Sequence, residues 1–97
     1  MLSHVVYFTL KDRTAEAATA LLAACREHLT GHPGEVFFSA GTCANTYDRE
    51  VNDRDWDVAL TIVFESQADH DAYQIAPRHQ QFIAENAPTW AMVRVFD

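Results

Sequence analysis

Strict alternation of bulky apolar residues is the feature that most limits the folds open to this chain. It is clearest over Trp56–Phe64, where every second residue is large and apolar, namely Trp56, Val58, Leu60, Ile62 and Phe64. A period of two is that of a β-strand, because successive side chains of a strand point to opposite faces of the sheet. The segment therefore predicts a strand whose bulky face lies against the core.

Leu2–Leu10 shows the same pattern and predicts another strand. Its more apolar face carries one polar residue, His4, among Leu2, Val6, Phe8 and Leu10. Glu35–Gly41 and Thr89–Phe96 are rich in aromatic or β-branched residues and are also expected to be strands. We expect the helix-facing side of the sheet to carry Val6, Phe8, Leu60 and Ile62.

Capping signals predict three helices between these strands. Thr14 is a typical N-cap residue, and an apolar stripe follows it at helical spacing, made of Ala18, Leu21, Leu22, Cys25 and Leu29. Ser66 and Asp69 have the spacing of a capping box, so the second helix should begin near Gln67. Pro77 ends that helix and suits the first turn of a third one.

The order of these elements is strand, helix, strand, strand, helix, helix, strand. It predicts a ferredoxin-like α+β domain, with a four-stranded antiparallel sheet and helices on one face. A chain of 97 residues is long enough for a single core, so residues 1–97 are expected to form one domain. The polar loop 42–54 is long for such a domain and is expected to be either a working loop or a mobile one.

The sheet face that turns away from the helices is also apolar by this pattern. We expect it to carry Val5, Tyr7, Val63, Val93 and Val95. A bare apolar sheet face of this extent usually marks an interface, which predicts a homodimer built by packing two sheets face to face. The alternative is that these residues are scattered surface valines, which are common.

Charge and composition exclude several classes of partner. Seven basic and fourteen acidic residues give a formal net charge of −7, which argues against nucleic acid and against an anionic membrane surface. No segment resembles a signal peptide or a membrane span, so the cytoplasm is the expected location. Cys25 and Cys43 have no disulfide or metal-ligand spacing, and a helix end separates His28 from His32, so no metal site is predicted.

Tyr73 and His79 are the strongest candidates for chemistry. His79 and Phe82 share one face of the third helix, so His79 should point inward. An imidazole is the usual general base, and a tyrosine hydroxyl donates a hydrogen bond to a carbonyl or enolate oxygen. The pair suits proton abstraction next to a carbonyl. The alternative is that Tyr73, His79 and the inward-facing His4 are core side chains whose polar atoms are satisfied.

Four segments carry a resemblance to a known family. They are Ser3–Phe8, Val63–Ser66, Asp71–His79 and Val93–Asp97, and they resemble the stress-responsive A/B barrel (Dabb) family over essentially the whole chain. The stretch from Tyr73 to His79 is the most specific part of the resemblance. It implies a ferredoxin-like monomer and a dimeric α/β barrel built by packing the sheets.

Plant polyketide cyclases, one branch of that family, are similar at the candidate site. There a histidine and a tyrosine promote aldol-type ring closure without a metal or organic cofactor, and His79 and Tyr73 match them, with His4 matching a further pocket histidine. This chain departs from the branch at Val58, where the branch has a histidine, and at Leu22 and Cys25, where it has aromatic residues. The resemblance implies catalytic roles for His79, Tyr73 and His4, and a ligand cavity walled by Val6, Leu22, Cys25, Val58 and Phe82.

Two classes of function remain open. The first is an enzyme or binding protein that takes a small apolar or aromatic carbonyl compound into a cavity between sheet and helices without a cofactor. A cofactor-independent monooxygenase is a variant of this class by fold analogy. The second is a non-catalytic stress-response dimer. A cavity that touches Tyr73, His4 and His79 favours the first class, and a filled core there favours the second.

Overall fold

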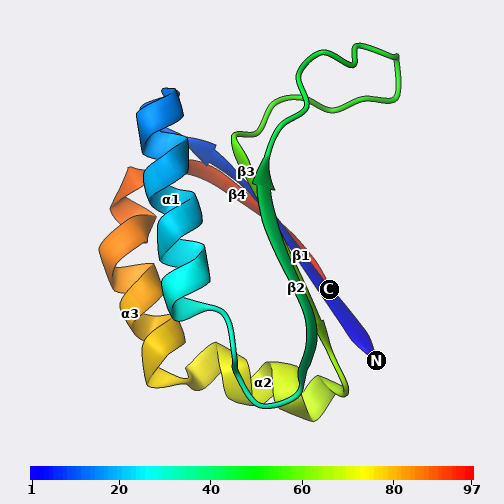
Figure 1. Cartoon of the computed structure of the whole chain (residues 1–97), viewed down its shortest axis with the longest axis vertical. Coiled ribbons are helices and arrows are strands. Elements are labelled where there is room, and N and C mark those ends of the chain that lie inside the picture. Colours follow the sequence, from blue (N-terminus) through cyan, green and yellow to red (C-terminus); the bar gives the residue numbers. More distant parts are fainter.

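Four strands form one antiparallel sheet, and three helices lie on one side of it (Figure 1). The computed structural model describes residues 1–97. The elements in chain order are β1 (Leu2–Leu10), α1 (Ala15–His28), β2 (Glu35–Thr42), β3 (Val58–Phe64), α2 (Gln67–Ile75), α3 (Pro77–Asn86), a 3-10 turn (Ala87–Thr89) and β4 (Trp90–Phe96). The strands lie in the order β2-β3-β1-β4, and every neighbouring pair is antiparallel. The predicted ferredoxin-like α+β fold is confirmed.

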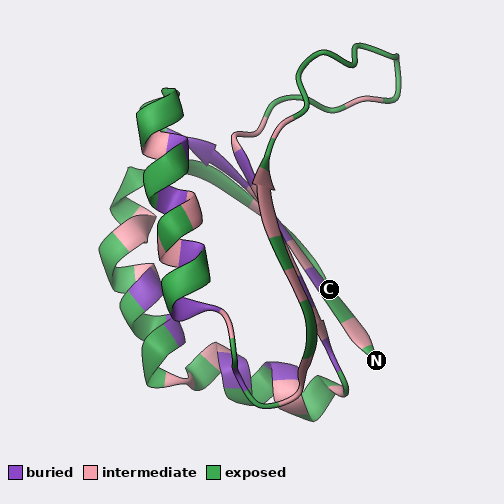
Figure 2. Ribbon diagram, in the orientation of Figure 1, coloured by how far each residue is buried: buried purple, intermediate pink, exposed green.

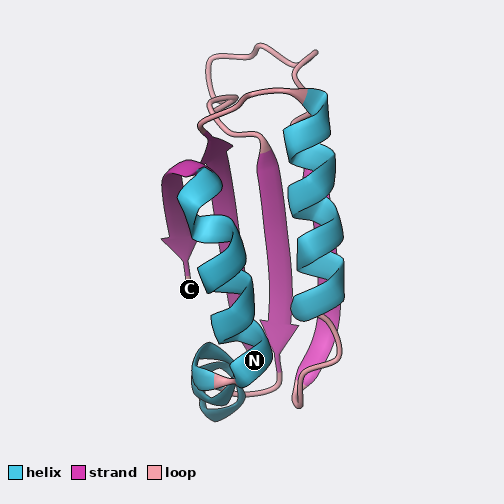
Figure 3. Cartoon of the chain, turned by 90° about the vertical axis from the view of Figure 1, so that its left-hand side faces the viewer, coloured by secondary structure: helices cyan, strands magenta, loops and turns pink.

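The helices begin at the residues that the capping signals indicate. The Thr14 hydroxyl oxygen accepts a hydrogen bond from the Ala17 backbone N–H at 3.2 Å, and the Ser66 hydroxyl oxygen accepts one from the Asp69 N–H at 3.1 Å. Pro77 is the first residue of α3, where its missing N–H is no loss. α1 and α3 run side by side over the sheet, while α2 lies across one of its ends (Figures 1 and 3). None of these helices combines the length and the apolar character that crossing a membrane requires.

The core lies between the helices and one face of the sheet (Figure 2). Val6, Phe8, Leu60 and Ile62 are all buried there, as the alternation predicted. Cys25 and Leu29 reach the same core from the helix side. Burying an apolar side chain of this size stabilises the fold by roughly 1.5–3 kcal/mol. The central strands and the apolar stripe of α1 therefore hold the domain together.

The face predicted for Val93 and Val95 is wrong. Val93 pairs with Phe8 and Val95 pairs with Val6, and residues directly opposite each other in a ladder lie on the same face. Both valines thus lie on the helix-facing side. The register of β1 and β4 shifts between Thr9 and Leu10, which places Trp90 opposite Leu10. This irregularity brings the Trp90 ring onto Phe8 as well, with the two ring centroids 4.8 Å apart.

The far face of the sheet is apolar even without those two valines. Val5 pairs with Phe96, and Val63 pairs with Phe37, so these four side chains share the face that turns away from the helices. Phe37 is 55% exposed and Phe96 is 56% exposed. Tyr7 lies on the same face, with its ring 6.1 Å from that of Phe96. A band of aromatic and aliphatic side chains therefore crosses the sheet without a covering layer in this chain.

The segment between β2 and β3 projects away from the body of the domain (Figure 1). Its return end is tied to the far face, because Arg94 donates a hydrogen bond to Asp53 at 2.6 Å and the Trp56 ring lies 5.2 Å from that of Tyr7. Trp56 therefore does not continue the alternation of β3, which begins at Val58. Between Trp56 and the start of β3, the Asp57 carboxylate accepts a hydrogen bond from the Leu10 N–H at 2.8 Å.

Candidate active site

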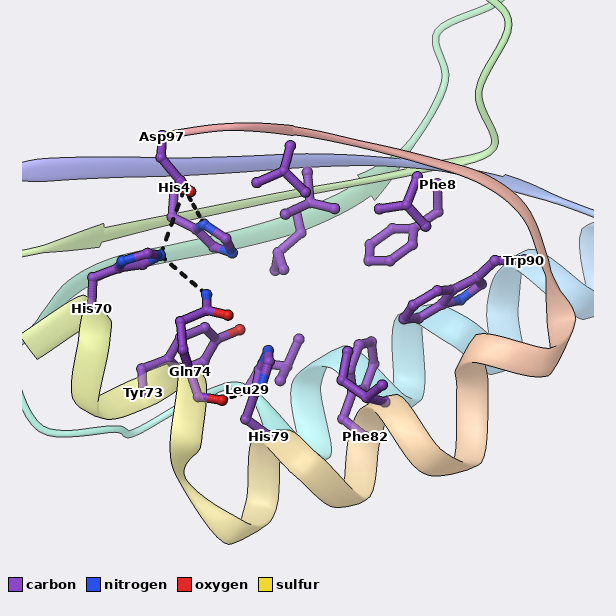
Figure 4. Close-up of a pocket in the computed structure, with 15 residues that line it drawn as sticks. His4, Phe8, Leu29, His70, Tyr73, Gln74, His79, Phe82, Trp90 and Asp97 are labelled. Atoms are coloured by element: carbon purple, nitrogen blue, oxygen red, sulfur yellow. Dashed lines mark hydrogen bonds and ion pairs between the residues drawn. The ribbon is translucent and has the colours of Figure 1, made fainter.

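A cavity of about 390 Å³ opens between the helix-facing side of the sheet and the helices α2 and α3 (Figure 4). Such a volume lies within the range of small-molecule sites. β1 and β4 form one wall, and α2 and α3 form the other. The residues that line it are His4, Val6, Phe8, Leu29, Leu60, His70, Tyr73, Gln74, His79, Phe82, Ile83, Trp90, Val93, Val95 and Asp97.

The cavity has an apolar end and a polar end. At the apolar end the rings of Phe8, Phe82 and Trp90 lie with centroids 4.8–6.3 Å apart. The Nε1–H of Trp90 is buried there without a hydrogen-bond partner. At the polar end the side chains of Tyr73 and His79 point toward each other in Figure 4. The shape fits a small aromatic or apolar molecule that carries a polar group at one end.

Tyr73 is the most deeply placed polar side chain of the cavity. It is only 2% exposed, and its hydroxyl group is buried without any hydrogen-bond partner. Burial raises the pKa of this phenol, so the hydroxyl keeps its proton at neutral pH. An unsatisfied buried polar group costs about 1–3 kcal/mol. A free donor of this kind is available to a ligand oxygen.

His79 lies beside Tyr73 as a neutral base. The two ring centroids are 4.6 Å apart. His79 Nδ1 lies 3.1 Å from the Gln74 backbone oxygen, and a carbonyl oxygen only accepts, so Nδ1 carries the proton and Nε2 keeps its lone pair. Burial lowers the pKa of His79 below its ordinary value of 6.5. The imidazole is therefore unprotonated at neutral pH.

His4, His70 and Asp97 form a cluster at the same end of the cavity. His4 donates a hydrogen bond from Nδ1 to Asp97 Oδ1, and His70 Nε2 lies 3.6 Å from the same oxygen. The ring of His4 lies 5.7 Å from that of Tyr73. Burial lowers the pKa of His4, even though the carboxylate of Asp97 acts in the opposite direction. His4 is thus also a neutral imidazole that faces the Tyr73 ring.

Comparison with known proteins identifies the family. Residues 2–97 match the Stress responsive A/B Barrel Domain, or Dabb. This chain belongs to the Dabb family. No match to it was found among curated proteins.

Solved structures share the fold of this Dabb domain at low sequence identity. A Dabb family protein with a ferredoxin-like fold from Mesorhizobium loti is 20% identical, with a TM-score of 0.80 over 97% of this chain and 90% of that one. A dimeric ferredoxin-like protein of unknown function from Thermobifida fusca is 20% identical, with a TM-score of 0.76 and coverage of 97% and 85%. A hydroxynitrile lyase from Passiflora edulis is 20% identical, with a TM-score of 0.75 and coverage of 97% and 87%.

The Dabb domain brings together some of the predicted site residues and separates others. His4, Tyr73, His79, Val6 and Phe82 all line the cavity. The other three residues expected in the cavity wall, Leu22, Cys25 and Val58, do not. Cys25 and Val58 are fully buried in the core, and Leu22 packs against it, because α1 faces β3 and β2 rather than the cavity. Burial raises the pKa of the Cys25 thiol to about 12, which leaves it unreactive.

Four polar or aromatic residues that line the cavity were not predicted from the sequence. His70 and Gln74 lie three residues before and one residue after Tyr73 on α2, so helical spacing alone could have found His70 on the Tyr73 face. Trp90 enters the cavity only through the register shift of β4. Asp97 follows β4, and nothing local indicates that it meets His4. The other two histidines, His28 and His32, do not line the cavity. His32 Nε2 contacts the His28 carbonyl oxygen at 2.7 Å.

Proposed function

We propose that this Dabb domain binds a small apolar or aromatic carbonyl compound and catalyses an aldol-type or cyclase-type reaction on it with His79 and Tyr73. One observation carries the proposal: the Tyr73 hydroxyl is buried without a partner beside the neutral imidazole of His79, in a cavity large enough for a ligand. A proton donor and a base around one space are what proton abstraction next to a carbonyl requires.

The reaction uses side chains of the chain itself. The substrate carbonyl oxygen accepts the Tyr73 hydrogen bond, and His79 Nε2 takes a proton from the adjacent carbon. The resulting enolate carbon forms a bond to a second carbonyl carbon, and the new alkoxide receives the proton back from His79. The Gln74 carbonyl holds Nδ1–H of His79 throughout, which stabilises the imidazolium form. His4 orients the substrate or relays a proton at the same end of the cavity.

The aromatic end of the cavity selects the ligand class. Phe8, Phe82 and Trp90 offer ring edges and faces to an aromatic or aliphatic group. The hydroxynitrile lyase among the similar structures supports an enzymatic use of this fold, although the likeness concerns the fold alone.

The test uses acetophenone, an aryl methyl ketone, as the probe in deuterated water. Proton NMR follows the loss of the methyl signal as the base exchanges protons for deuterons. We expect the wild type to accelerate exchange, and His79→Asn to lower the accelerated rate by roughly 10²- to 10⁴-fold, which is the usual contribution of a general base. Tyr73→Phe should lower it as well.

A matched control separates this site from histidine in general. His28 is buried but lies outside the cavity, so His28→Asn should leave the exchange rate unchanged. A wild type that neither binds the ketone nor accelerates its exchange would favour the alternative, a non-catalytic stress-response dimer.

We also propose that two copies form a homodimer through the far faces of their sheets. The exposed Phe37 and Phe96, with Val5 and Val63 between them, form an apolar surface that a second copy would cover. The similar protein from Thermobifida fusca is described as dimeric, which supports this assembly. The cytoplasmic location stays a prediction.

A further inference from the structure

Three side chains from distant parts of the sequence meet at the polar end of the cavity. His4 comes from β1, His70 comes from α2, and Asp97 follows β4. One potential ligand atom from each lies within 4.8 Å of the other two. The two imidazole rings are buried, with their centroids 4.9 Å apart. No ligand spacing in the sequence indicates this group, because only the tertiary structure brings its members together.

His70 Nε2 accepts a hydrogen bond from Gln74 and lies close to the Asp97 carboxylate. The Gln74 amide nitrogen lies 3.1 Å from His70 Nε2, and an amide N–H only donates, so this ring nitrogen presents its lone pair. Asp97 Oδ1 lies 3.6 Å from the same nitrogen. An imidazole nitrogen has one lone pair, so a cation bound to His70 Nε2 would take the place of the Gln74 N–H, and its positive charge would attract the Asp97 carboxylate as well. The cluster therefore has a place for a cation.

We propose that His4, His70 and Asp97 bind one divalent transition-metal ion of the zinc, cobalt or nickel type. Neutral imidazole nitrogens and a carboxylate oxygen are ligands that these ions prefer over magnesium or calcium. Three protein ligands leave at least one coordination position open, and all three side chains line the cavity that Tyr73 also lines (Figure 4). The ion takes the place of the proton between His4 Nδ1 and Asp97, and that proton moves to Nε2 of the same neutral ring.

This site goes beyond the proposed function: it shares His4 with that function, but neither the base His79 nor the donor Tyr73 supplies a ligand. Tyr73 has its hydroxyl free, and His79 has Nδ1 on the Gln74 carbonyl. An ion at the cluster would place a Lewis acid next to the bound ligand and would attract a carbonyl or carboxylate oxygen.

The test is a titration of the chelator-treated full chain with Co²⁺, which reports nitrogen and oxygen ligands through its visible d–d absorption. We expect one ion per chain, and competition by Zn²⁺. His70→Asn and Asp97→Asn should each weaken Co²⁺ binding by at least about tenfold, since even loss of a group that only supports a ligand weakens metal affinity by roughly 10–100-fold. Asp97 is partly exposed, so Asp97→Asn tests the site without threatening the fold.

Two control variants make the result specific. His28→Asn removes a buried histidine outside the cavity, and His79→Asn removes the one that faces Tyr73, so both should bind Co²⁺ as the wild type does. Absence of one-to-one binding overturns the proposal, and so does binding that survives in Asp97→Asn and His70→Asn. Because the readout is metal affinity, failure here leaves ketone exchange by His79 untouched, and the reverse also holds.

Discussion

When no ligand is bound, the buried Tyr73 hydroxyl lowers the free energy of unfolding of the chain. It is buried, has no partner, and lies among the rings of His79, His4 and Phe64. A ligand-binding role explains why the chain keeps a buried hydroxyl that costs folding free energy and forms no internal hydrogen bond. At the residue scale, the Tyr73 hydroxyl therefore lowers stability while it serves the proposed function.

Tyr73→Phe is expected to raise the free energy of unfolding by about 1 kcal/mol while it lowers ketone exchange. The substitution keeps the ring and removes only the unsatisfied hydroxyl. Urea denaturation measures the change. Tyr47→Phe is the matched control, because Tyr47 is exposed in the β2–β3 loop and should leave stability unchanged. A clear loss of stability in Tyr73→Phe would mean that the hydroxyl is bonded in solution.

His79 makes the stability of the domain depend on pH. Burial, with the neighbouring His4, His32 and His70 in the same direction, holds its pKa below 6.5. Above pH 6.5 the ring is neutral in both states and has no effect. As the pH falls below 6.5, the unfolded chain binds the proton first, so stability decreases until the pH has passed below the folded-state pKa.

The expected outcome is a falling thermal midpoint between pH 7 and pH 5, with a shallower fall in His79→Asn. The measurements are made with a chelator, so that metal binding does not contribute. An equally steep fall in the variant would assign the dependence to other groups.

At the scale of elements, the turn before β2 positions α2 and hence the polar end of the cavity. Gly31 and Gly34 both have positive φ, of 76° and 85°. A Cβ atom at Gly34 would overlap the side chain of Asp69, the residue that pairs with the Ser66 cap of α2. A Cβ atom at Gly31 would meet nothing within 4 Å.

Gly34→Ala is therefore expected to destabilise the domain more than Gly31→Ala. Each substitution should lower the free energy of unfolding by roughly 1–2 kcal/mol, because an alanine is strained in the left-handed backbone region. Gly34→Ala should lower it by about 1 kcal/mol or more in addition, because its Cβ atom overlaps α2. Urea denaturation of the two variants gives the difference directly. Equal losses would mean that α2 moves freely to make room.

At the scale of the whole molecule, the far sheet face is the largest feature that one chain leaves unexplained. Val63→Lys places a charge on the central part of that face, beside Phe37. A stable interface of standard size buries roughly 1,600 Å² in total and does not tolerate an unpaired charge at its centre.

We expect Val63→Lys to give monomers or aggregates in analytical ultracentrifugation, while the wild type sediments as a dimer. Ile75→Lys, at an exposed position of α2 on the helix side of the sheet, should remain dimeric. A wild type that sediments as a monomer at micromolar concentration would contradict the proposed assembly.

The sequence by itself determined the kinds of elements and most of their ends. The alternation in β1 and β3, the caps at Thr14 and Ser66 and the break at Pro77 depend on residues close together in the chain, so local physics is sufficient to predict them. The inward direction of His79 followed from helical spacing in the same way.

Only the tertiary structure decided which elements meet, and with which register. Pairing with Phe8 placed Val93 on the helix-facing side, and the shift between Thr9 and Leu10 put Trp90 on that same face, although strict alternation separates the two residues. Pairing of β4 with β1 carried Asp97 to His4, and docking of α2 added His70. Such contacts join residues up to 93 positions apart, and no periodicity records them, because strand register is set by long-range packing.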